Sequence, residues 1–565
     1  MNKKLFLLFL VLSMMMTGCA PTQPSAQAVD TAQFAPTSPA EVSPATAAVI
    51  ETAVVTEPAA AIVPAAVSEE PITRALTSEP TGLDPHGAAG SGQNAILPFL
   101  FDTLVYRDLD NSVKPYLAER WEVAKDGKTI TFFLKEGLTF QDGTPLDAAA
   151  VKFSFERLKA NTKSPIAGGL ADVEQIEAVD AATVRFVFSH PSSTFLSTVA
   201  TPYTGVVSPK AAQESGDAFG QNPVGSGPYQ LESWSPGISI TLVRNPDYHW
   251  APPVVSNPAS PLTGTLVFKI IPDPSSQLTA FENGEVDILF VNQPGHVAKL
   301  KKDPNATVVE TTLNSLIYLG FNSQKAPFDN VEVRQALSHA VNKEEVLQIA
   351  LGGIGEVAFA PLAPTLPGFD PVLKSSELGY DPEKAKSLLQ AAGFEQTADG
   401  GWAKDGVPLQ VTLLTSTRSP NLAIATVLQA QYKAIGIPVE IQQLESQAAM
   451  DASSQGKFDL LLWRYDWNDA DVLYTNLSTG RIGRTNRTFY SNPALDTLLE
   501  QALRSMNESE RNALYLEAQQ IILRDAPWQP LYTPKDFMVY SNKVDGVVVG
   551  PMGRLLLNDA VKNKP

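Results

Sequence analysis

From Thr73 to the end of the chain, strand patterns and helix patterns alternate, and this alternation is the feature that most restricts the possible fold. In its clearest stretch, residues 409–414 read as an apolar strand, a helix follows from Ser419, Gly436 ends that helix, and residues 438–444 alternate as a second strand. A strand, a helix and a strand in this order predict a parallel βαβ unit with a right-handed crossover. The chain is therefore expected to fold as an α/β protein.

Local punctuation supports this assignment. Asp147, Asp381 and Asn507 each precede a run of apolar residues at helical spacing, where a short polar side chain can cap the first turn. Gly393 follows the second of these runs and is typical of a helix end. Earlier, an Asp-Gly pair within residues 125–128 separates two strand patterns and predicts a β-hairpin. The first part of the folded region is thus expected to be rich in strands.

Composition excludes several functions. The chain has 565 residues, enough for roughly two to four domains. Its 42 lysines and arginines stand against 60 acids, a formal net charge of -18, so its surface repels phosphate backbones and no nucleic-acid partner is expected. Cys19 is the single cysteine, which rules out an internal disulfide and a cysteine-rich metal site.

The first residues read as a targeting segment. A short basic start precedes an apolar run over residues 5–16, which is too short to span a bilayer as a stable helix. The sequence Met16-Thr17-Gly18-Cys19 resembles a bacterial lipobox, which implies a signal peptide over residues 1–18 and acylation of Cys19. The membrane would then be contacted through the lipid anchor only. The alternative is a plain secretory signal in which Cys19 is incidental.

Residues 19–71 are rich in alanine, proline and threonine, contain no lysine or arginine, and have Phe34 as their single aromatic residue. Such a segment cannot bury enough apolar surface to offset its conformational entropy. We expect a disordered tether, and a segment that interacts with the cell wall is the alternative.

Motifs for catalysis are missing from the sequence. The five histidines stand singly, without a zinc-binding pair, and no phosphate-binding glycine loop or serine nucleophile elbow occurs. Gly225-Ser226-Gly227 lacks the third glycine of a dinucleotide loop. We therefore expect no catalytic residues, no metal and no cofactor, although catalytic groups can also assemble from distant positions.

Several segments together resemble the bacterial ABC-transporter solute-binding proteins of family 5, which include dipeptide-, oligopeptide- and nickel-binding receptors. The most specific is Gly137-Leu138-Thr139-Phe140-Gln141-Asp142-Gly143-Thr144-Pro145-Leu146, followed by a helix over residues 151–158. The other matching segments are 83–86, 224–229 with 244–248, 284–288, and 319–322 with 328–337. They keep the family order over about residues 73–565.

The resemblance implies a two-lobed α/β fold of the type II periplasmic-binding-protein class, in the enlarged form of family 5. Lobe one would comprise residues 73–270 plus 533–565, and lobe two residues 271–532. Two hinge crossings would lie near residues 270–274 and 528–534, and the lobes would close around a ligand.

The resemblance also implies ligand-binding residues. Asp466 falls on the aspartate that receives the α-ammonium of a peptide, and Trp463 on the tryptophan three residues before it, with Trp467 alongside. A buried ammonium needs a carboxylate partner. The alternative is that Asp466 caps a turn and that the aromatic residues pack in the core. Leu462 and Ala470 depart from the usual pattern and put main-chain pairing at this edge in doubt.

On the opposite lobe, Gly90 and Ser91 fall where oligopeptide binders pair their main chain with the ligand, with Ala89 in place of an acid found in some members. Arg484, with Arg481 and Arg487 nearby, offers a partner for a ligand carboxylate. A solvated surface loop is the alternative for these arginines.

We therefore expect a monomeric receptor that captures peptides or peptide-like solutes and delivers them to a permease driven by separate ATPase subunits. An oligosaccharide receptor is the main alternative within the family, because Trp402, Trp463, Tyr465 and Trp467 offer apolar faces to sugar rings. A nickel receptor, a surface chaperone or signal-peptide receptor without import, and a hydrolase are the remaining alternatives.

Overall fold

The computed structural model describes residues 67–563, apart from residues 88, 163 and 165. The expected signal peptide, Cys19 and most of the expected tether lie outside the described residues. The expected end of the tether near Pro71 is too late, because Ser68 already pairs with Thr263 and its amide donates to the carbonyl oxygen of Leu262 at 2.8 Å. The folded part therefore begins at least five residues before Thr73, where the sequence patterns place its start.

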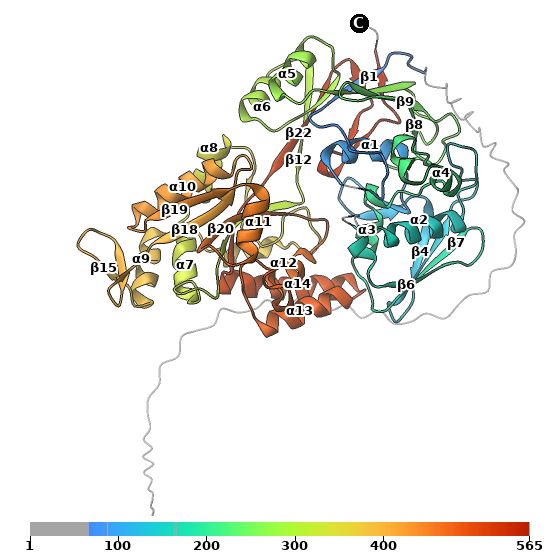
Figure 1. Ribbon diagram of the computed structural model, residues 1–565. Helices are drawn as coiled ribbons and strands as arrows, with labels where there is room; N and C mark the ends of the chain where they lie inside the picture. Colours follow the sequence, from blue (N-terminus) through green and yellow to red (C-terminus); the bar gives the residue numbers. More distant parts are fainter. Residues whose placement is uncertain (1–66, 88, 163, 165, 564–565) are drawn as a thin grey trace, which may run out of the picture. The chain divides into compact units, whose positions relative to one another are not determined.

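A seven-stranded mixed sheet has the order β12-β22-β11-β1-β10-β9-β8 (Figure 1). Its central strand β1 runs parallel to both β10 and β11, and the other pairs are antiparallel. The strands are β1 Ile72–Leu76, β8 Tyr229–Ser235, β9 Ser239–Arg244, β10 Thr265–Ile270, β11 Ile288–Val291, β12 Ala306–Thr312 and β22 Lys535–Ser541.

A six-stranded sheet has the order β14-β21-β13-β20-β18-β19. Strands β18 and β19 are parallel and α10 lies between them in sequence, which confirms the predicted βαβ unit. The strands are β13 Ser315–Phe321, β14 Glu356–Val357, β18 Val411–Ser416, β19 Val439–Leu444, β20 Leu460–Asp466 and β21 Trp528–Thr533.

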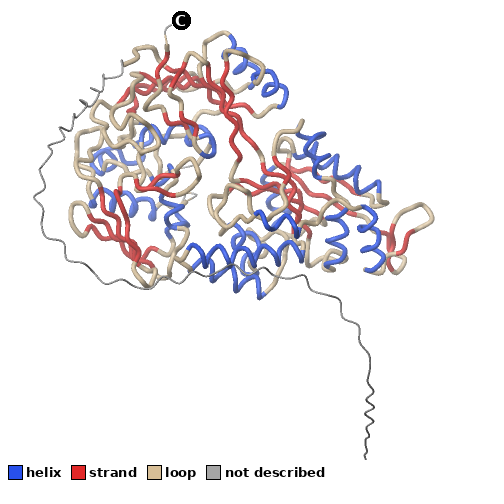
Figure 2. Tube along the Cα trace, turned by 180° about the vertical axis from the view of Figure 1, so that it is seen from behind, coloured by secondary structure: helices blue, strands red, loops and turns tan. Residues whose placement is uncertain are grey.

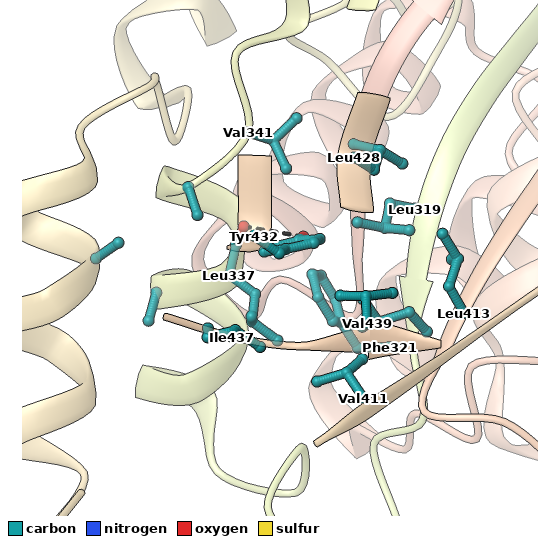
Figure 3. Packing of buried hydrophobic residues seen from close by; sticks show 14 of the residues in the cluster. Leu319, Phe321, Leu337, Val341, Val411, Leu413, Leu428, Tyr432, Ile437 and Val439 are labelled. Atoms are coloured by element: carbon teal, nitrogen blue, oxygen red, sulfur yellow. Dashed lines mark hydrogen bonds between the residues drawn. The ribbon is translucent and has the colours of Figure 1, made fainter. Parts of the chain in front are cut away.

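Helices cover both faces of this second sheet. Neighbouring residues of a strand point to opposite faces, so they pack against different helices. Leu413 packs in the cluster that contains Tyr432 of α10 (Asn421–Ala434), and Leu414 packs in a different cluster, beside Ala452 of α11 (Ser446–Ser454). Figure 3 shows Tyr432 among the aliphatic side chains of the first cluster, with its hydroxyl donating to the carbonyl oxygen of Leu337 at 3.1 Å.

A third, four-stranded antiparallel sheet has the order β4-β5-β7-β6. Strands β4 and β5 pair across residues 124–128, which confirms the predicted hairpin. The strands are β4 Ala118–Val123, β5 Thr129–Leu134, β6 Val173–Ala178 and β7 Thr183–Phe188. Helix α2 (Ala148–Ala160) begins as expected at Asp147, whose carboxylate accepts from the amide of Ala150 at 2.9 Å.

Eleven further helices are described, and two of them, α9 and α14, begin at the other predicted caps. The carboxylate of Asp381 accepts from the amide of Lys384 at 2.9 Å, and the side chain of Asn507 accepts from the amide of Glu510 at 3.0 Å. These helices are α1 Ser91–Leu100, α3 Phe195–Val199, α4 Pro209–Ser215, α5 Pro274–Glu282, α6 Pro294–Leu300, α7 Val331–His339, α8 Lys343–Leu351, α9 Pro382–Ala391, α12 Val472–Leu477, α13 Pro493–Arg504 and α14 Glu508–Asp525.

Three strand pairs and one three-stranded sheet complete the described part of the fold. They are β2 Val105–Arg107 with β3 Val113–Pro115; β15 Glu395–Gln396, β16 Trp402–Lys404 and β17 Val407–Pro408; β23 Val544–Asp545 with β26 Val561–Lys562; and β24 Val548–Val549 with β25 Leu555–Leu556. Among the described residues, no helix combines the length and the apolar character needed to cross a membrane.

The chain passes between the two large sheets at positions that differ in part from those expected. Residues 271–312, expected in lobe two, contribute β11 and β12 to the seven-stranded sheet, because both strands pair with β22. The first passage therefore lies at residues 313–314 rather than near 270–274. The return passage lies at Pro534, within the expected segment, and the amide of Leu313 donates to its carbonyl oxygen at 3.0 Å. Figures 1 and 2 show β12 and β22 extending together toward the six-stranded sheet.

Candidate functional site

A cavity of about 510 Å³ lies where the end of β1, the start of α1 and strand β22 come together. From the other large sheet, Asn468, two residues beyond the end of β20, also reaches its wall. The polar and charged residues that line it include Arg74, Thr77, Ser78, Ser91, Asn94, Arg107, Asn111, Tyr203, Gln277, Asn468, Asp536 and Arg554. A cavity of this volume accommodates a small organic solute.

Helix α1 is held closely against the segment that follows β1. A Cβ atom at Gly92 would lie 2.7 Å from the carbonyl oxygen of Ser78, so this approach requires glycine. The hydroxyl oxygens of Ser78 and Ser91 lie 2.8 Å apart, within hydrogen-bonding distance. Gly90 at the N-cap provides no side-chain cap, so the first turn of α1 depends on other acceptors for its amides. The positive end of this helix therefore forms part of the cavity wall.

Burial displaces the pKa values of charged residues in the wall, Arg74 and Asp536 among them. Burial lowers the pKa of Arg74 in β1 to about 10. Burial raises the pKa of Asp536 in β22 to about 6, and the nearby guanidinium of Arg464 opposes this rise. Both side chains are thus partly stripped of water, and each would gain from an oppositely charged group in the cavity.

Arg107 connects the cavity wall to the segment that follows β20. Its Nη2 donates to the carbonyl oxygen of Asn468 at 3.0 Å, and the hydroxyl of Ser197 donates to the carboxylate of Asp469 at 3.0 Å. Burial lowers the pKa of Arg107, and the Asp469 carboxylate acts in the opposite direction. Asn111 adds a bond from its Nδ2 to the carbonyl oxygen of Thr365 at 2.6 Å. These bonds join the strand-rich first part of the fold to the six-stranded sheet and its loops.

The expected ligand segment surrounds the end of β20. Asp466 is the last residue of β20, pairs with Ser315, and forms an ion pair with Arg464. Its side chain is 46% exposed, so the carboxylate is accessible to a ligand. The indole nitrogen of Trp467 donates to the carboxylate of Asp471 at 2.5 Å. Burial, and then the charge of nearby Asp469, raise the pKa of Asp471 to about 7, and the bond from Trp467 acts against them.

Comparison with known proteins places this geometry in a family. Residues 112–483 match the model of the bacterial extracellular solute-binding proteins, family 5 Middle. The chain belongs to this family. Its fold class is thereby confirmed as the two-lobed α/β fold of family 5, whose members are extracytoplasmic solute-binding proteins and not enzymes.

Individual relatives of this family 5 protein cover most of its length. The Di/tripeptide-binding protein 2 of Pseudomonas aeruginosa is 31% identical over 519 residues, which are 86% of this chain and 94% of that protein. The Glutathione-binding protein GsiB of Salmonella typhi is 29% identical over 502 residues, 86% of this chain and 93% of that protein. The solved structure of DppA from Helicobacter pylori in complex with the peptide STSA is 28% identical, with a TM-score of 0.69 over 88% of this chain and 99% of that chain.

Of the six ligand-binding residues expected from the sequence of this family 5 protein, Ser91 lies in the cavity wall. Gly90 precedes it, and its carbonyl oxygen accepts from the amide of Asn94 at 2.9 Å. Trp463 is half-buried in β20, and the guanidinium of Arg487 lies 5.2 Å from the centre of its ring. Arg484 is exposed in the turn after α12.

Asp466 and Trp467 lie immediately before Asn468, which does line the cavity. The structure thus places Ser91 in the cavity wall, Asp466 and Trp467 beside the wall residue Asn468, and Arg484 on an exposed turn. The roles of the six residues stay predictions.

The site also contains charged residues that the sequence patterns did not single out, above all Arg74 and Asp536. A signal existed, because each is a charged residue within an otherwise largely apolar strand, Ile72–Leu76 and Lys535–Ser541. A charge at such a position is costly unless it faces a partner or a polar cavity.

The aromatic residues that support a sugar ligand are only partly available. Trp402 is 2% exposed, and its indole nitrogen donates to the carbonyl oxygen of Ile435 at 2.7 Å. Tyr465 is also buried, and its hydroxyl donates to the carbonyl oxygen of Pro361 at 3.0 Å. Neither ring presents a face to a ligand, which leaves Trp463 and Trp467 from the set expected to stack on sugars.

A metal site is equally unsupported within the described part of the chain, where no three histidine, cysteine or acidic side chains are placed to hold an ion. His86 in the matched segment 83–86 is buried, and burial and the neighbouring Arg157 lower its pKa to about 4. Its ring nitrogens lie 3.1 Å from the carbonyl oxygen of Gly205 and 2.8 Å from a guanidinium nitrogen of Arg157. Both ring nitrogens of His86 are therefore engaged within the folded chain, and this histidine is not placed to bind a metal ion.

Proposed function

We propose that this family 5 protein captures peptides or peptide-like solutes in this cavity by closure of its two lobes and delivers them to a permease driven by separate ATPase subunits. The observation that carries the proposal is the similarity to a di/tripeptide-binding protein over 86% of this chain and 94% of that protein. Coverage of this extent goes well beyond a single shared segment.

The cavity has the features that a short peptide requires. Its volume of about 510 Å³ falls within the range of small-ligand sites, roughly 300–1,000 Å³. Hydroxyl, amide and carboxamide groups of Ser78, Ser91, Asn94 and Asn468 line it and match the donors and acceptors of a peptide main chain. A solute without such groups would leave these polar atoms unpaired.

The residues at the end of β20 receive the amino end of the ligand in this proposal. The Asp466 carboxylate is exposed and already holds one cation, the guanidinium of Arg464. A ligand ammonium would join or replace that partner, while Trp463 and Trp467 would pack beside it. Gly90 and Ser91 would pair with the main chain, and Arg484 would meet a carboxylate when the lobes close.

The N-terminal segment determines where the receptor acts. Acylation of Cys19 after removal of residues 1–18 would hold the protein at the extracytoplasmic face of the membrane, as a monomer on a tether. The lipobox-like Met16-Thr17-Gly18-Cys19 supports this part of the proposal. Two or more acyl chains give stable anchoring where a single chain is marginal.

The function is tested by native mass spectrometry of the full chain secreted as the Cys19→Ser variant, followed by release and identification of any solute that co-purifies. Short peptides are the expected finding. A bound sugar, or an empty protein that oligosaccharides and not peptides stabilise against heat, contradicts the peptide assignment.

The role of Asp466 is tested separately by calorimetry with the peptides identified in this way. If Asp466 receives the ammonium, Asp466→Ala weakens binding by about tenfold or more, since about 1.4 kcal/mol corresponds to one decade of affinity. Asp217→Ala, at an exposed acid outside the cavity, is the matched control and should bind normally. Equal affinities for the two variants would show that Asp466 is not the ammonium partner.

A further inference from the structure

The cavity wall is cationic although the chain as a whole is strongly acidic. Its lining residues include three arginines, Arg74, Arg107 and Arg554, and one acid, Asp536. The whole chain carries 60 acids against 42 lysines and arginines. The charge of the wall is thus opposite in sign to that of the chain as a whole, and a cavity with low-dielectric walls concentrates its field.

Arg74 carries the strongest evidence for an anionic occupant. Its Nη1 donates to the carbonyl oxygen of Ala95 at a long 3.4 Å, and its Nε is buried without a hydrogen-bond partner. Among the described residues it forms no ion pair. A guanidinium has five N–H donors in a fixed fork, and most of those on Arg74 are left for a group that the folded chain does not supply.

The other two arginines are also without a carboxylate of their own. Arg107 donates to main-chain oxygens, and Asp469, the acid that influences its pKa, is already ion-paired with Arg511. Arg554 has a buried Nε without a partner and is absent from the ion pairs of the described residues. It lies close enough to the buried Asp102 to lower the pKa of that carboxyl. The positive charge in the wall is therefore only partly compensated.

We propose that the cavity selects peptide-like solutes with an acidic side chain, and that Arg74 forms a charge-assisted hydrogen bond with that second carboxylate. This inference rests on the proposed capture of peptides and names the substrate class. The amino end and the terminal carboxylate are shared by all peptides, whereas an added side-chain carboxylate supplies the anion that Arg74 lacks. The positive end of α1, which has no acidic residue in its first turn, adds to the same field.

The test is isothermal titration of the full chain, as the Cys19→Ser variant freed of co-purified solute, with the tripeptides Ala-Glu-Ala, Ala-Gln-Ala and Ala-Lys-Ala. Glu and Gln side chains have nearly the same size, so the ratio of their affinities reports the charge alone. We expect Ala-Glu-Ala to bind about tenfold or more tighter than Ala-Gln-Ala, and Ala-Lys-Ala to bind least.

Variants locate the effect. Arg74→Gln should bring the ratio of the Ala-Glu-Ala and Ala-Gln-Ala affinities close to one, through a larger loss of affinity for Ala-Glu-Ala than for Ala-Gln-Ala. Arg504→Gln, which removes an exposed arginine of α13 outside the cavity, is the charge-matched control and should keep the wild-type ratio. A ratio near one in the wild type, or a ratio that Arg74→Gln does not change, overturns the inference.

The outcomes separate this inference from the proposed function. Binding of all three tripeptides with equal affinity refutes selection for acids and leaves peptide capture in place. If no tripeptide binds but the tricarboxylate citrate does, and Arg74→Gln abolishes that binding, then peptide capture fails and the anion site stands. Failure of both tripeptides and citrate to bind contradicts both. If Arg74→Gln lowers the thermal stability, Arg554→Gln provides the second test, with a smaller expected fall in the ratio.

Discussion

Asp102, between the cavity-lining residues Phe101 and Thr103, should make the stability of the protein fall as the pH rises from about 4 to 7. Its side chain is fully buried, Ser226 Oγ and Trp250 Nε1 each donate to its Oδ2 at 2.9 Å, and the hydroxyl of Tyr116 donates to its Oδ1. Burial raises the pKa of Asp102 from 3.8 to about 6, although these hydrogen bonds act in the opposite direction.

The sign and size of the effect follow from this displacement. Between pH 3.8 and about 6, the folded protein keeps a proton on Asp102 that the unfolded chain has lost. The folded state is therefore favoured in acid, and that advantage is lost as the pH rises through this window. At about 1.4 kcal/mol for each pH unit between the two pKa values, the loss amounts to about 3 kcal/mol.

The perturbation is Asp102→Asn, which preserves the side-chain shape and removes the titration. The new amide group would face Tyr116, whose hydroxyl can accept from it and donate to the hydroxyl of Tyr248, 2.7 Å away. Urea unfolding of both proteins at several pH values gives the difference in their free energies of unfolding. Asp536, whose pKa burial also raises, is present in both proteins, so its contribution cancels.

We expect the Asn variant to gain about 3 kcal/mol relative to the wild type between pH 4 and pH 7. Asp217→Asn, at an exposed acid, should show a constant difference. A pH-independent difference for Asp102→Asn would show that Asp102 is ionised in the folded protein down to its ordinary pKa, and the reasoning from burial would be wrong.

Two further predictions concern packing and buried charge. Gly227→Ala would place a Cβ atom 2.6 Å from the carbonyl oxygen of Phe99, so it should destabilise the protein by about 1–3 kcal/mol or more. Gly168→Ala, where no atom lies within 4 Å of the new Cβ atom, should leave the melting temperature nearly unchanged. Equal effects of the two substitutions would contradict the predicted overlap. Arg511→Met removes the ion-pair partner of buried Asp469 and should lower the free energy of unfolding in urea by about 3–5 kcal/mol. Adding Asp469→Leu should recover most of that loss. A double variant less stable than the single one would refute the buried-charge explanation.

Sequence patterns predicted those parts of the fold that depend on neighbouring residues. Asp147, Asp381 and Asn507 cap helices as expected, because a cap requires a side chain and an amide within three positions of each other. The βαβ unit of the second large sheet was predictable for the same reason: strand β18, helix α10 and strand β19 follow one another directly.

Long-range pairing was not predictable in this way. The first passage between the sheets was expected too early, because β11 and β12 join the seven-stranded sheet by pairing with β22, more than 200 residues later in the chain. The cavity has the same origin, since Arg74 in β1 lies more than 400 residues before Asp536 and Arg554, and the seven-stranded sheet, which contains both β1 and β22, brings them to one wall. The family resemblance directed attention to Asp466 and Ser91, and it contained no information on charges specific to this chain.

The two passages between the sheets form a single mechanical element. Strands β12 and β22 pair up to Thr312 and Lys535, Leu313 and Pro534 share a hydrogen bond, and β13 and β21 continue the pairing in the second sheet. A paired ribbon resists stretching and sliding but yields to twisting and bending, so it confines relative motion of the lobes to those two modes. The main-chain carbonyl oxygen of the neighbouring Asn314 accepts from the amide of Trp467 at 2.9 Å. Torque in the ribbon is thereby transmitted directly to the end of β20, where we propose that the ligand's amino group binds.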